Sequence, residues 1–166
     1  IVERSARTPF YDGPALLELL ESLPAESARA DRPLRLPVQM VIRPRAAAAE
    51  GLSEYRGYAG SIAAGTVSVG DEVVVLPSRR RTAVTGINLG ARALPSARAG
   101  QSVALELADD IDIARGDVIA GPRGLPPLVR EIDAHVAWLS EHPLHGDDRI
   151  LVKHGTRTVR ALVAGI

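Results

Sequence analysis

The chain has 166 residues, of which 46% are hydrophobic but only 3% aromatic, so a buried core must be built from Val, Ile, Leu and Ala. Basic and acidic residues balance at 20 each, and this neutral charge disfavours a nucleic-acid binder. The absence of cysteine excludes disulfides and Cys-based zinc sites, and no apolar run reaches the roughly 18 residues of a membrane span. The start at Ile1, without an initiator Met or signal core, predicts a segment of a longer, cytoplasmic protein.

The first predicted element is a helix over 14–23. An Asp-Gly pair supplies its cap, Pro14 takes the first helical position, and Pro24 ends it. The leucines at 16, 17, 20 and 23 form one apolar stripe. A helix this short is unstable in isolation, so we expect it to pack on another surface.

Residues 24–33 are polar and bracketed by prolines, which predicts a linker. The pattern then changes to short β runs separated by glycine-containing turns, among them Gly70-Asp71 and Gly116-Asp117. The predicted strands lie near 35–43, 55–63, 72–76, 82–88, 101–107 and 117–120. Six short strands at this spacing predict a small closed barrel, a form without exposed edges.

The stretch GPRGLPP at 121–127 predicts an interdomain linker. After it, 129–139 alternates like a strand, and 149–164 contains two further β runs. About 40 residues are too few for an independent barrel, so this part is interpreted as the start of a second one. The expected divisions are therefore 1–30, 31–122 and 123–166.

No motif typical of an enzyme is found in the chain. A GxxxxGK[ST] loop, a GxGxxG turn between a strand and a helix, and a recognisable Ser-His-Asp spacing are all absent. We therefore expect no catalytic, cofactor-binding or metal-binding residue, and a chain that is inactive by itself.

Two polar clusters contain side chains of the types that bind metal ions. The segment HPLHGDD offers imidazole and carboxylate ligands, but its spacing matches no known ligand set, so a polar loop is the favoured interpretation. An acidic run suggests calcium, but it lacks the EF-hand spacing and is better explained as an edge loop. The residues of the two clusters are His142, His145, Asp147 and Asp148, and Asp109, Asp110 and Asp112.

Arg79, Arg80 and Arg81 form a dense positive cluster at a predicted hairpin tip. Guanidinium groups bind phosphate well, but a solvated turn is the favoured interpretation, with contact to a partner or another domain as the alternative. Trp138, the only tryptophan, is expected in core or interdomain packing. The pair Lys153-His154 is expected to have a structural role beside a turn.

The segment GSIAAGTVSVGDEVVVLPS at 60–78 resembles the second-domain signature of translational GTPases, G-x-[IV]-x-x-G-x-[VI]-x-x-G-D-x-[VI]-x-[VIL]-x-P. Residues 99–105 and 113–119 resemble the closing strands of the same domain. The resemblance implies a mainly β protein with a closed barrel like domain 2 of elongation factor Tu. A short helix would precede this barrel, and the first strands of a barrel like domain 3 would follow it.

Further segments indicate one branch of that superfamily. YDGPALLE at 11–18, RGYAG at 56–60 and LADDIDIARGD at 107–117 resemble the sulfate adenylyltransferase large subunit, which is sometimes fused to adenylylsulfate kinase. WLSE at 138–141 and KHGT at 153–156 resemble the opening of its third domain. Phe10 stands where Trp is common, and Arg79 stands where many members have Gly.

The resemblance implies that the parent protein couples GTP hydrolysis to adenylyl transfer from ATP to sulfate, giving adenylylsulfate and pyrophosphate. GTP and Mg²⁺ would bind in a domain upstream of Ile1, and a separate small subunit would carry the adenylyl-transfer site. This chain would be a non-catalytic barrel region that moves as a unit when the nucleotide changes. The alternative is a tRNA-contacting barrel of a translation elongation factor.

Overall fold

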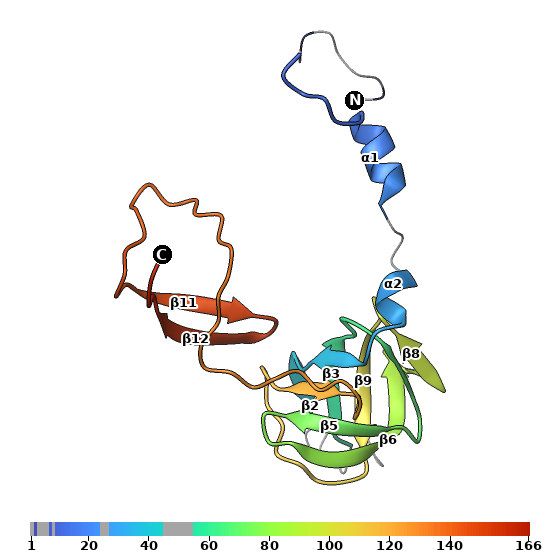
Figure 1. Cartoon of the computed structure of the whole chain (residues 1–166). Coiled ribbons are helices and arrows are strands. Elements are labelled where there is room, and N and C mark those ends of the chain that lie inside the picture. Colours follow the sequence, from blue (N-terminus) through green and yellow to red (C-terminus); the bar gives the residue numbers. More distant parts are fainter. Residues whose placement is uncertain (1, 3–6, 8, 24–26, 45–54) are drawn as a thin grey trace.

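The computed structural model describes residues 2, 7, 9–23, 27–44 and 55–166, and Figure 1 shows them as a barrel with a helix and a hairpin outside it. Short strands separated by turns make up most of this part of the chain. The helices are α1 (Leu16–Ser22) and α2 (Ser27–Ala30). The strands are β1 (Arg35–Pro37), β2 (Met40–Ile42), β3 (Gly57–Ser61), β4 (Thr66–Ser68), β5 (Glu72–Leu76), β6 (Arg80–Leu89), β7 (Arg92–Ala93), β8 (Ser96–Arg98), β9 (Ser102–Leu107), β10 (Val118–Ala120), β11 (Arg149–His154) and β12 (Arg157–Leu162).

The barrel is one antiparallel sheet in the order β1-β10-β5-β6-β9-β3-β2, with β7 paired to β6. Its two edge strands, β1 and β2, are consecutive pieces of the same segment, so that segment closes the barrel. Arg35 exchanges backbone hydrogen bonds with Ala64 and Ala63, and the Gln39 N–H donates to Ala59 O at 2.8 Å. On the other side, the Val38 N–H donates to Asp117 O at 2.8 Å. The predicted closed barrel is confirmed.

Two glycines allow the closing segment to lie against β3. A Cβ atom on Gly60 would collide with the carbonyl oxygen of Pro37, and one on Gly65 would lie 2.5 Å from the Cα and N atoms of Leu34. Both obstacles are backbone atoms, which cannot move aside without opening the barrel. Gly65 also has a φ of 80°, a conformation that only glycine adopts readily.

Aliphatic side chains fill the barrel, as the composition predicted. Alternating residues of the longer barrel strands point inward, and Tyr58 is the one aromatic residue among the described members of the core. Its hydroxyl donates to Ile111 O at 3.0 Å, so the buried phenol is satisfied. The core comprises Leu34, Leu36, Val38, Tyr58, Ile62, Val67, Val73, Val75, Val84, Ile87, Ala97, Val103, Leu105, Ile111, Ile113 and Ile119.

Four turns share one hydrogen-bond pattern. In each, the fourth residue donates its N–H to the carbonyl of the first, and its side-chain oxygen accepts the N–H of the first. The predicted Gly-Asp turns are two of them. The turns span residues 68–71, 98–101, 114–117 and 145–148.

The strands differ from the prediction in three ways. The predicted strand 35–43 is split into β1 and β2, because the segment changes neighbours at Val38 and Gln39. β4, β7 and β8 were not predicted, since runs of two or three residues are too short to show a period. The predicted strand at 129–139 is wrong, because no strand pairs with that segment within the described chain.

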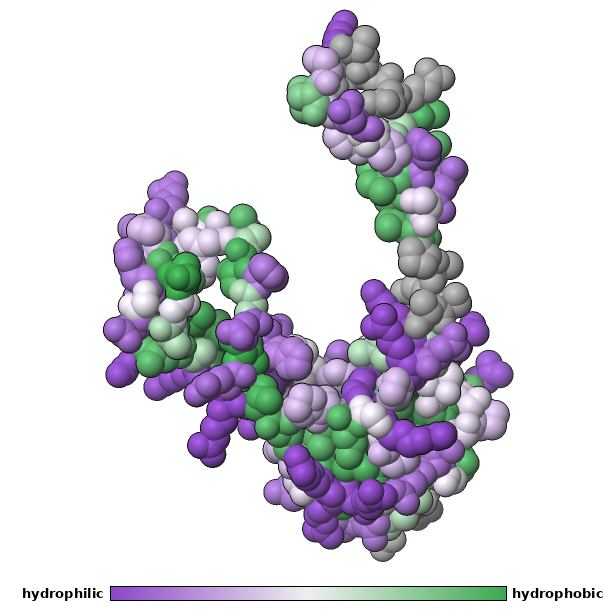
Figure 2. Space-filling view, in the orientation of Figure 1, coloured by the Kyte–Doolittle hydropathy of each residue, from purple (hydrophilic) through white to green (hydrophobic). Residues whose placement is uncertain are grey.

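α1 begins later than predicted and buries no side chain. Its N-cap is Ala15, so Pro14 lies outside the helix. Its leucines remain between 39% and 55% exposed, and Figure 2 shows apolar side chains at the surface along it. The linker predicted at 24–33 instead contains α2, where Arg29 O accepts the Gly65 N–H at 2.8 Å; residues 24–26 lie outside the described part.

The C-terminal part contributes the hairpin β11–β12, which confirms the two β runs predicted at 149–164. The predicted linker at 121–127 is attached to the barrel. The Gly121 N–H donates to Leu34 O at 3.2 Å, and the Arg35 guanidinium donates to the carbonyls of Leu34 and Gly124. Burial lowers the pKa of Arg35 from its usual value. None of the described helices has the length and apolarity needed to cross a membrane.

We predict that Gly65→Ala destabilises the barrel far more than Gly70→Ala. Both glycines have a positive φ, of 80° and 94°, so each substitution incurs about 1 to 2 kcal/mol of backbone strain. Only Gly65 faces backbone atoms, whereas no atom lies within 4 Å of a Cβ on Gly70. Urea unfolding should show a further loss of about 1 to 3 kcal/mol for Gly65→Ala. Equal losses in the free energy of unfolding for the two substitutions would show that closure of the barrel does not depend on the contact between Gly65 and Leu34.

We predict that Tyr58→Phe lowers the free energy of unfolding by about 1 to 2 kcal/mol, because it removes the buried hydrogen bond to Ile111. The matched control is Tyr11→Phe, which removes an exposed hydrogen bond to Pro14 O and should have a smaller effect. Burial raises the pKa of Tyr58, so its stabilising contribution is complete at neutral pH. That contribution should be lost as the pH rises past about 10, where unfolded tyrosine ionises. If the difference in the free energy of unfolding between wild type and Tyr58→Phe stayed constant as the pH rose, this assignment would be contradicted.

Candidate functional site

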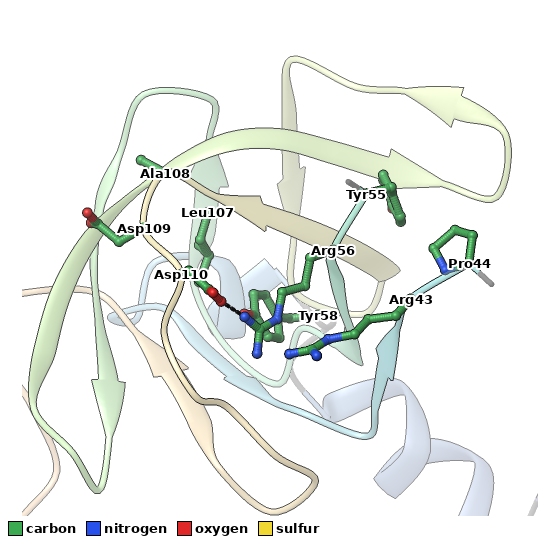
Figure 3. A pocket seen from close by; sticks show the side chains of 9 residues that line it. All are labelled: Arg43, Pro44, Tyr55, Arg56, Tyr58, Leu107, Ala108, Asp109 and Asp110. Carbon is green, nitrogen blue, oxygen red and sulfur yellow. Dashed lines mark ion pairs between the residues drawn. The ribbon is translucent and has the colours of Figure 1, made fainter. Parts of the chain in front are cut away.

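A pocket of about 510 Å³ opens at one end of the barrel. The antiparallel register places the end of β2, the start of β3 and the end of β9 at this rim. Figure 3 shows the side chains that line it, which combine two cations, two acids and two tyrosines. The lining residues are Arg43, Pro44, Tyr55, Arg56, Tyr58, Leu107, Ala108, Asp109 and Asp110.

Strand geometry brings Arg56 and Tyr58 together. The two residues are separated by one position at the start of β3, so their side chains lie on the same face. The Arg56 guanidinium carbon lies 5.6 Å from the centre of the Tyr58 ring, within the range of a cation–π contact. The Tyr58 hydrogen bond to Ile111 also holds the loop that follows β9, and this loop carries Asp110.

The electrostatics of the pocket centre on Arg56. Its guanidinium forms an ion pair with Asp110, shown dashed in Figure 3, and the two side chains are 20% and 86% exposed. The Nε atom of Arg56 is buried without a hydrogen-bond partner. Desolvation raises the pKa of Tyr58, while the positive charges of Arg56 and Arg43 act in the opposite direction. The phenol is therefore neutral at physiological pH and serves as a hydrogen-bond donor.

Arg43 brings a second cation to the same pocket from the end of β2. Figure 3 shows its guanidinium directed toward the region occupied by Arg56 and Tyr58. Within the described residues, Arg43 forms neither an ion pair nor a hydrogen bond. The pocket thus contains guanidinium donors without an acceptor in the described residues, those of Arg43 and the Nε–H of Arg56, an arrangement suited to binding an anion.

The predicted arginine cluster lies at the tip of the β5–β6 hairpin, as expected. Arg79 occupies the turn with a φ of 61°, a left-handed conformation that glycine adopts more readily than other residues. Arg80 begins β6 opposite Val75. Arg81 forms an ion pair with Glu72 at 2.5 Å, and both side chains are more than half exposed. A role of this cluster in contacting a partner remains a prediction.

The HPLHGDD segment forms a turn before β11. The His145 N–H donates to Asp148 Oδ2 at 2.8 Å, and Asp147 takes the positive φ position, at 68°. Asp148 therefore accepts the backbone N–H of the first residue of its turn, as Asp71 and Asp117 do in theirs. In the described part of the chain, no group of three or more His, Asp or Glu side chains is arranged to hold a metal ion.

The remaining candidates are in the acidic run and the C-terminal part. Asp109 and Asp110 lie in the loop after β9, where the Asp109 N–H donates to Thr82 Oγ1 at 3.2 Å. Trp138 is 45% exposed and donates its indole N–H to His142 O at 2.7 Å, so it lies outside the core of the described residues. Its packing against another domain stays a prediction. Lys153 and His154 end β11 beside a turn, which is consistent with the predicted structural role.

The tip of the β11–β12 hairpin reaches the barrel. A Cβ atom on Gly116 would lie 3.1 Å from Cβ of Arg157, and one on Gly155 would lie 3.7 Å from Cβ of Pro37. Thr156, between these contacts, has a buried hydroxyl without a hydrogen-bond partner. The turn at residues 114–117 and the end of β1 therefore form the surface of the barrel that this hairpin contacts.

The sequence alone does not predict this pocket. Arg56 belongs to the RGYAG motif, and no motif contains Arg43. One available signal was the spacing of Arg56 and Tyr58, which places a cation and an aromatic ring on one face of a strand. The contribution of Arg43 depends on the pairing of Ile42 with Gly57, which no local pattern reveals.

No protein-family model matches the chain. Among solved structures, the translation elongation factor SelB of Methanococcus maripaludis superposes with a TM-score of 0.69 over 88% of this chain and 30% of its own, at 21% identity. Sup35 complexed with GMPPNP superposes with a TM-score of 0.62 over 99% of this chain and 39% of its own, also at 21% identity. These similarities establish a fold shared with the translation elongation factor SelB and with Sup35.

Curated proteins match over the full length of the chain. The bifunctional enzyme CysN/CysC of Mycobacterium tuberculosis is 41% identical, and the bifunctional enzyme NodQ of Rhizobium sp. is 38% identical. Sulfate adenylyltransferase subunit 1 of Shewanella oneidensis is 39% identical. In each case all of this chain is covered, but only 27%, 25% and 33% of the relative. The chain is therefore homologous over its whole length to one region of the sulfate adenylyltransferase large subunit (CysN and NodQ) family, and spans about a quarter to a third of those relatives.

Proposed function

We propose that this chain is the non-catalytic barrel region of a GTP-dependent regulatory large subunit of sulfate adenylyltransferase, acting in sulfate assimilation. The reaction of the whole enzyme would convert ATP and sulfate to adenylylsulfate and pyrophosphate. The observation that carries the proposal is the identity of 38% to 41% along the entire chain with proteins of this family.

In this proposal the barrel transmits a nucleotide-dependent change rather than performing chemistry. GTP and Mg²⁺ would bind in the domain that precedes the barrel, and a small catalytic subunit would carry out adenylyl transfer. A barrel closed on itself moves as a rigid body, which suits it to pass a movement from one neighbour to another. The names of two relatives describe bifunctional enzymes, so a fused adenylylsulfate kinase is an additional candidate neighbour.

The described surface offers two places for such neighbours. The exposed leucines of α1 form an apolar face that buries nothing within the described chain, which supports packing against another domain. The tip formed by Arg79, Arg80 and Arg81 is the densest positive feature of the barrel and supports contact with an acidic surface. Both are proposed as contact surfaces of the larger assembly.

A tRNA-contacting barrel of an elongation factor is the second candidate, because the translation elongation factor SelB shares the fold. At 21% identity that likeness concerns the fold alone. The balanced charge of 20 basic and 20 acidic residues also favours the first candidate, since tRNA binding relies on neutralising phosphates.

We predict that this chain can replace the homologous region of the Shewanella oneidensis sulfate adenylyltransferase subunit 1. The chimera should retain GTP-stimulated formation of adenylylsulfate when assayed with the matching small subunit. A chimera carrying the barrel of SelB is the matched control, and it should lose the stimulation because it shares only the fold.

The outcome is interpretable when the chimera purifies as a folded protein that still hydrolyses GTP. Loss of stimulation under those conditions would argue against the coupling role. Binding of aminoacyl-tRNA by the chimera, with a steep fall in affinity as salt increases, would instead favour the elongation-factor alternative.

A further inference from the structure

We propose that the pocket at the end of the barrel binds the phosphate or sulfate group of a small-molecule anion, held between Arg43 and Arg56. Such a site lies outside the coupling role proposed above. It is tested on the chain itself, so its failure would leave the proposed function untouched.

The first support is the unmet hydrogen-bonding capacity of Arg56. Its Nε–H is buried without an acceptor, and buried donors in folded proteins nearly always have one. The ion-pair partner of Arg56, Asp110, is 86% exposed on a loop. A pair with so exposed a carboxylate is weakly held, so an incoming oxyanion can take its place or share the guanidinium.

The second support is the convergence of two cations. Arg43 and Arg56 come from adjacent strands and line the same pocket. The positive charges of both guanidinium groups and the negative charge of Asp112 act on Tyr58. Asp110 forms an ion pair with Arg56, and Figure 3 shows Asp109 directed away from the guanidinium groups. A bound anion would offset the repulsion that remains between the like charges.

The chemistry of the donors selects the ligand group. A guanidinium offers a planar fork of N–H donors that matches the oxygens of phosphate or sulfate in a bidentate manner. Two such forks suit a tetrahedral oxyanion with several acceptor oxygens. The Tyr58 ring limits where the Arg56 guanidinium can lie, because the guanidinium carbon is held 5.6 Å from the centre of that ring.

The size of the pocket indicates more than a bare ion. Its volume of about 510 Å³ is typical of small-molecule sites. Tyr55, Pro44 and Leu107 supply apolar wall beside the cations. A nucleoside monophosphate, with an aromatic base and one phosphate, is a probe of suitable size and charge.

The test is an NMR titration of the 166-residue chain with AMP, inorganic phosphate and inorganic sulfate at low ionic strength, where exposed charges are least screened. All three should give saturable shifts of backbone amides around Tyr58 and Leu107, with AMP binding more tightly than the inorganic ions. Arg43→Gln should weaken AMP binding about tenfold, the usual effect of losing a charge-assisted hydrogen bond. Arg80→Gln is the matched control, because it removes the same charge at the β5–β6 tip and should not change the affinity.

Arg43 is exposed, so its replacement leaves the core intact, and Arg43→Lys should restore part of the affinity by keeping the charge. Arg56→Lys tests the buried donor separately and should also weaken binding. Absence of saturable shifts with all three probes would overturn the proposal. It would equally be overturned if Arg43→Gln and Arg80→Gln had the same effect, or if only an acidic peptide bound the pocket.

Discussion

The barrel depends on the close approach of the segment that contains β1 and β2 to the backbone of β3. The segment that contains β1 and β2 lies against β3 at Gly60 and against the connection from β3 to β4 at Gly65, where any side chain would meet backbone atoms of Pro37 or Leu34. This close approach lets a single segment pair with β10 on one side and β3 on the other. Without it the sheet would keep two open edges, and its aliphatic inner face would be exposed to water.

The pocket is a product of the same closure. Pairing of β2 with β3 brings Arg43 to the rim that Arg56 already occupies, and the Tyr58 hydroxyl attaches the loop after β9 to that rim. The cations are thus positioned by backbone pairing that the barrel requires in any case. The functional groups at the rim can therefore vary among related barrels without changing the fold.

The sequence predicted those parts of the fold that depend on local patterns. Alternating aliphatic residues identified β5, β6 and β9, and Gly-Asp pairs identified two of the four shared turns. The same alternation was misleading at 129–139, because a strand also needs a neighbour to pair with. The pocket depends on pairing between distant segments. No local sequence pattern predicted that Arg79 adopts a positive φ, of 61°, in the turn between β5 and β6.

The C-terminal part is attached to the barrel near both ends of β1 and at the turn of residues 114–117. Residues 121–124 are held near Leu34 and Arg35, and the hairpin tip rests near Pro37 at the other end of the same strand. The contact between Gly116 and Arg157 lies away from β1, so the hairpin tip is held from two sides of the barrel end. A displacement of β1 or of the turn at residues 114–117 would therefore carry the hairpin tip with it.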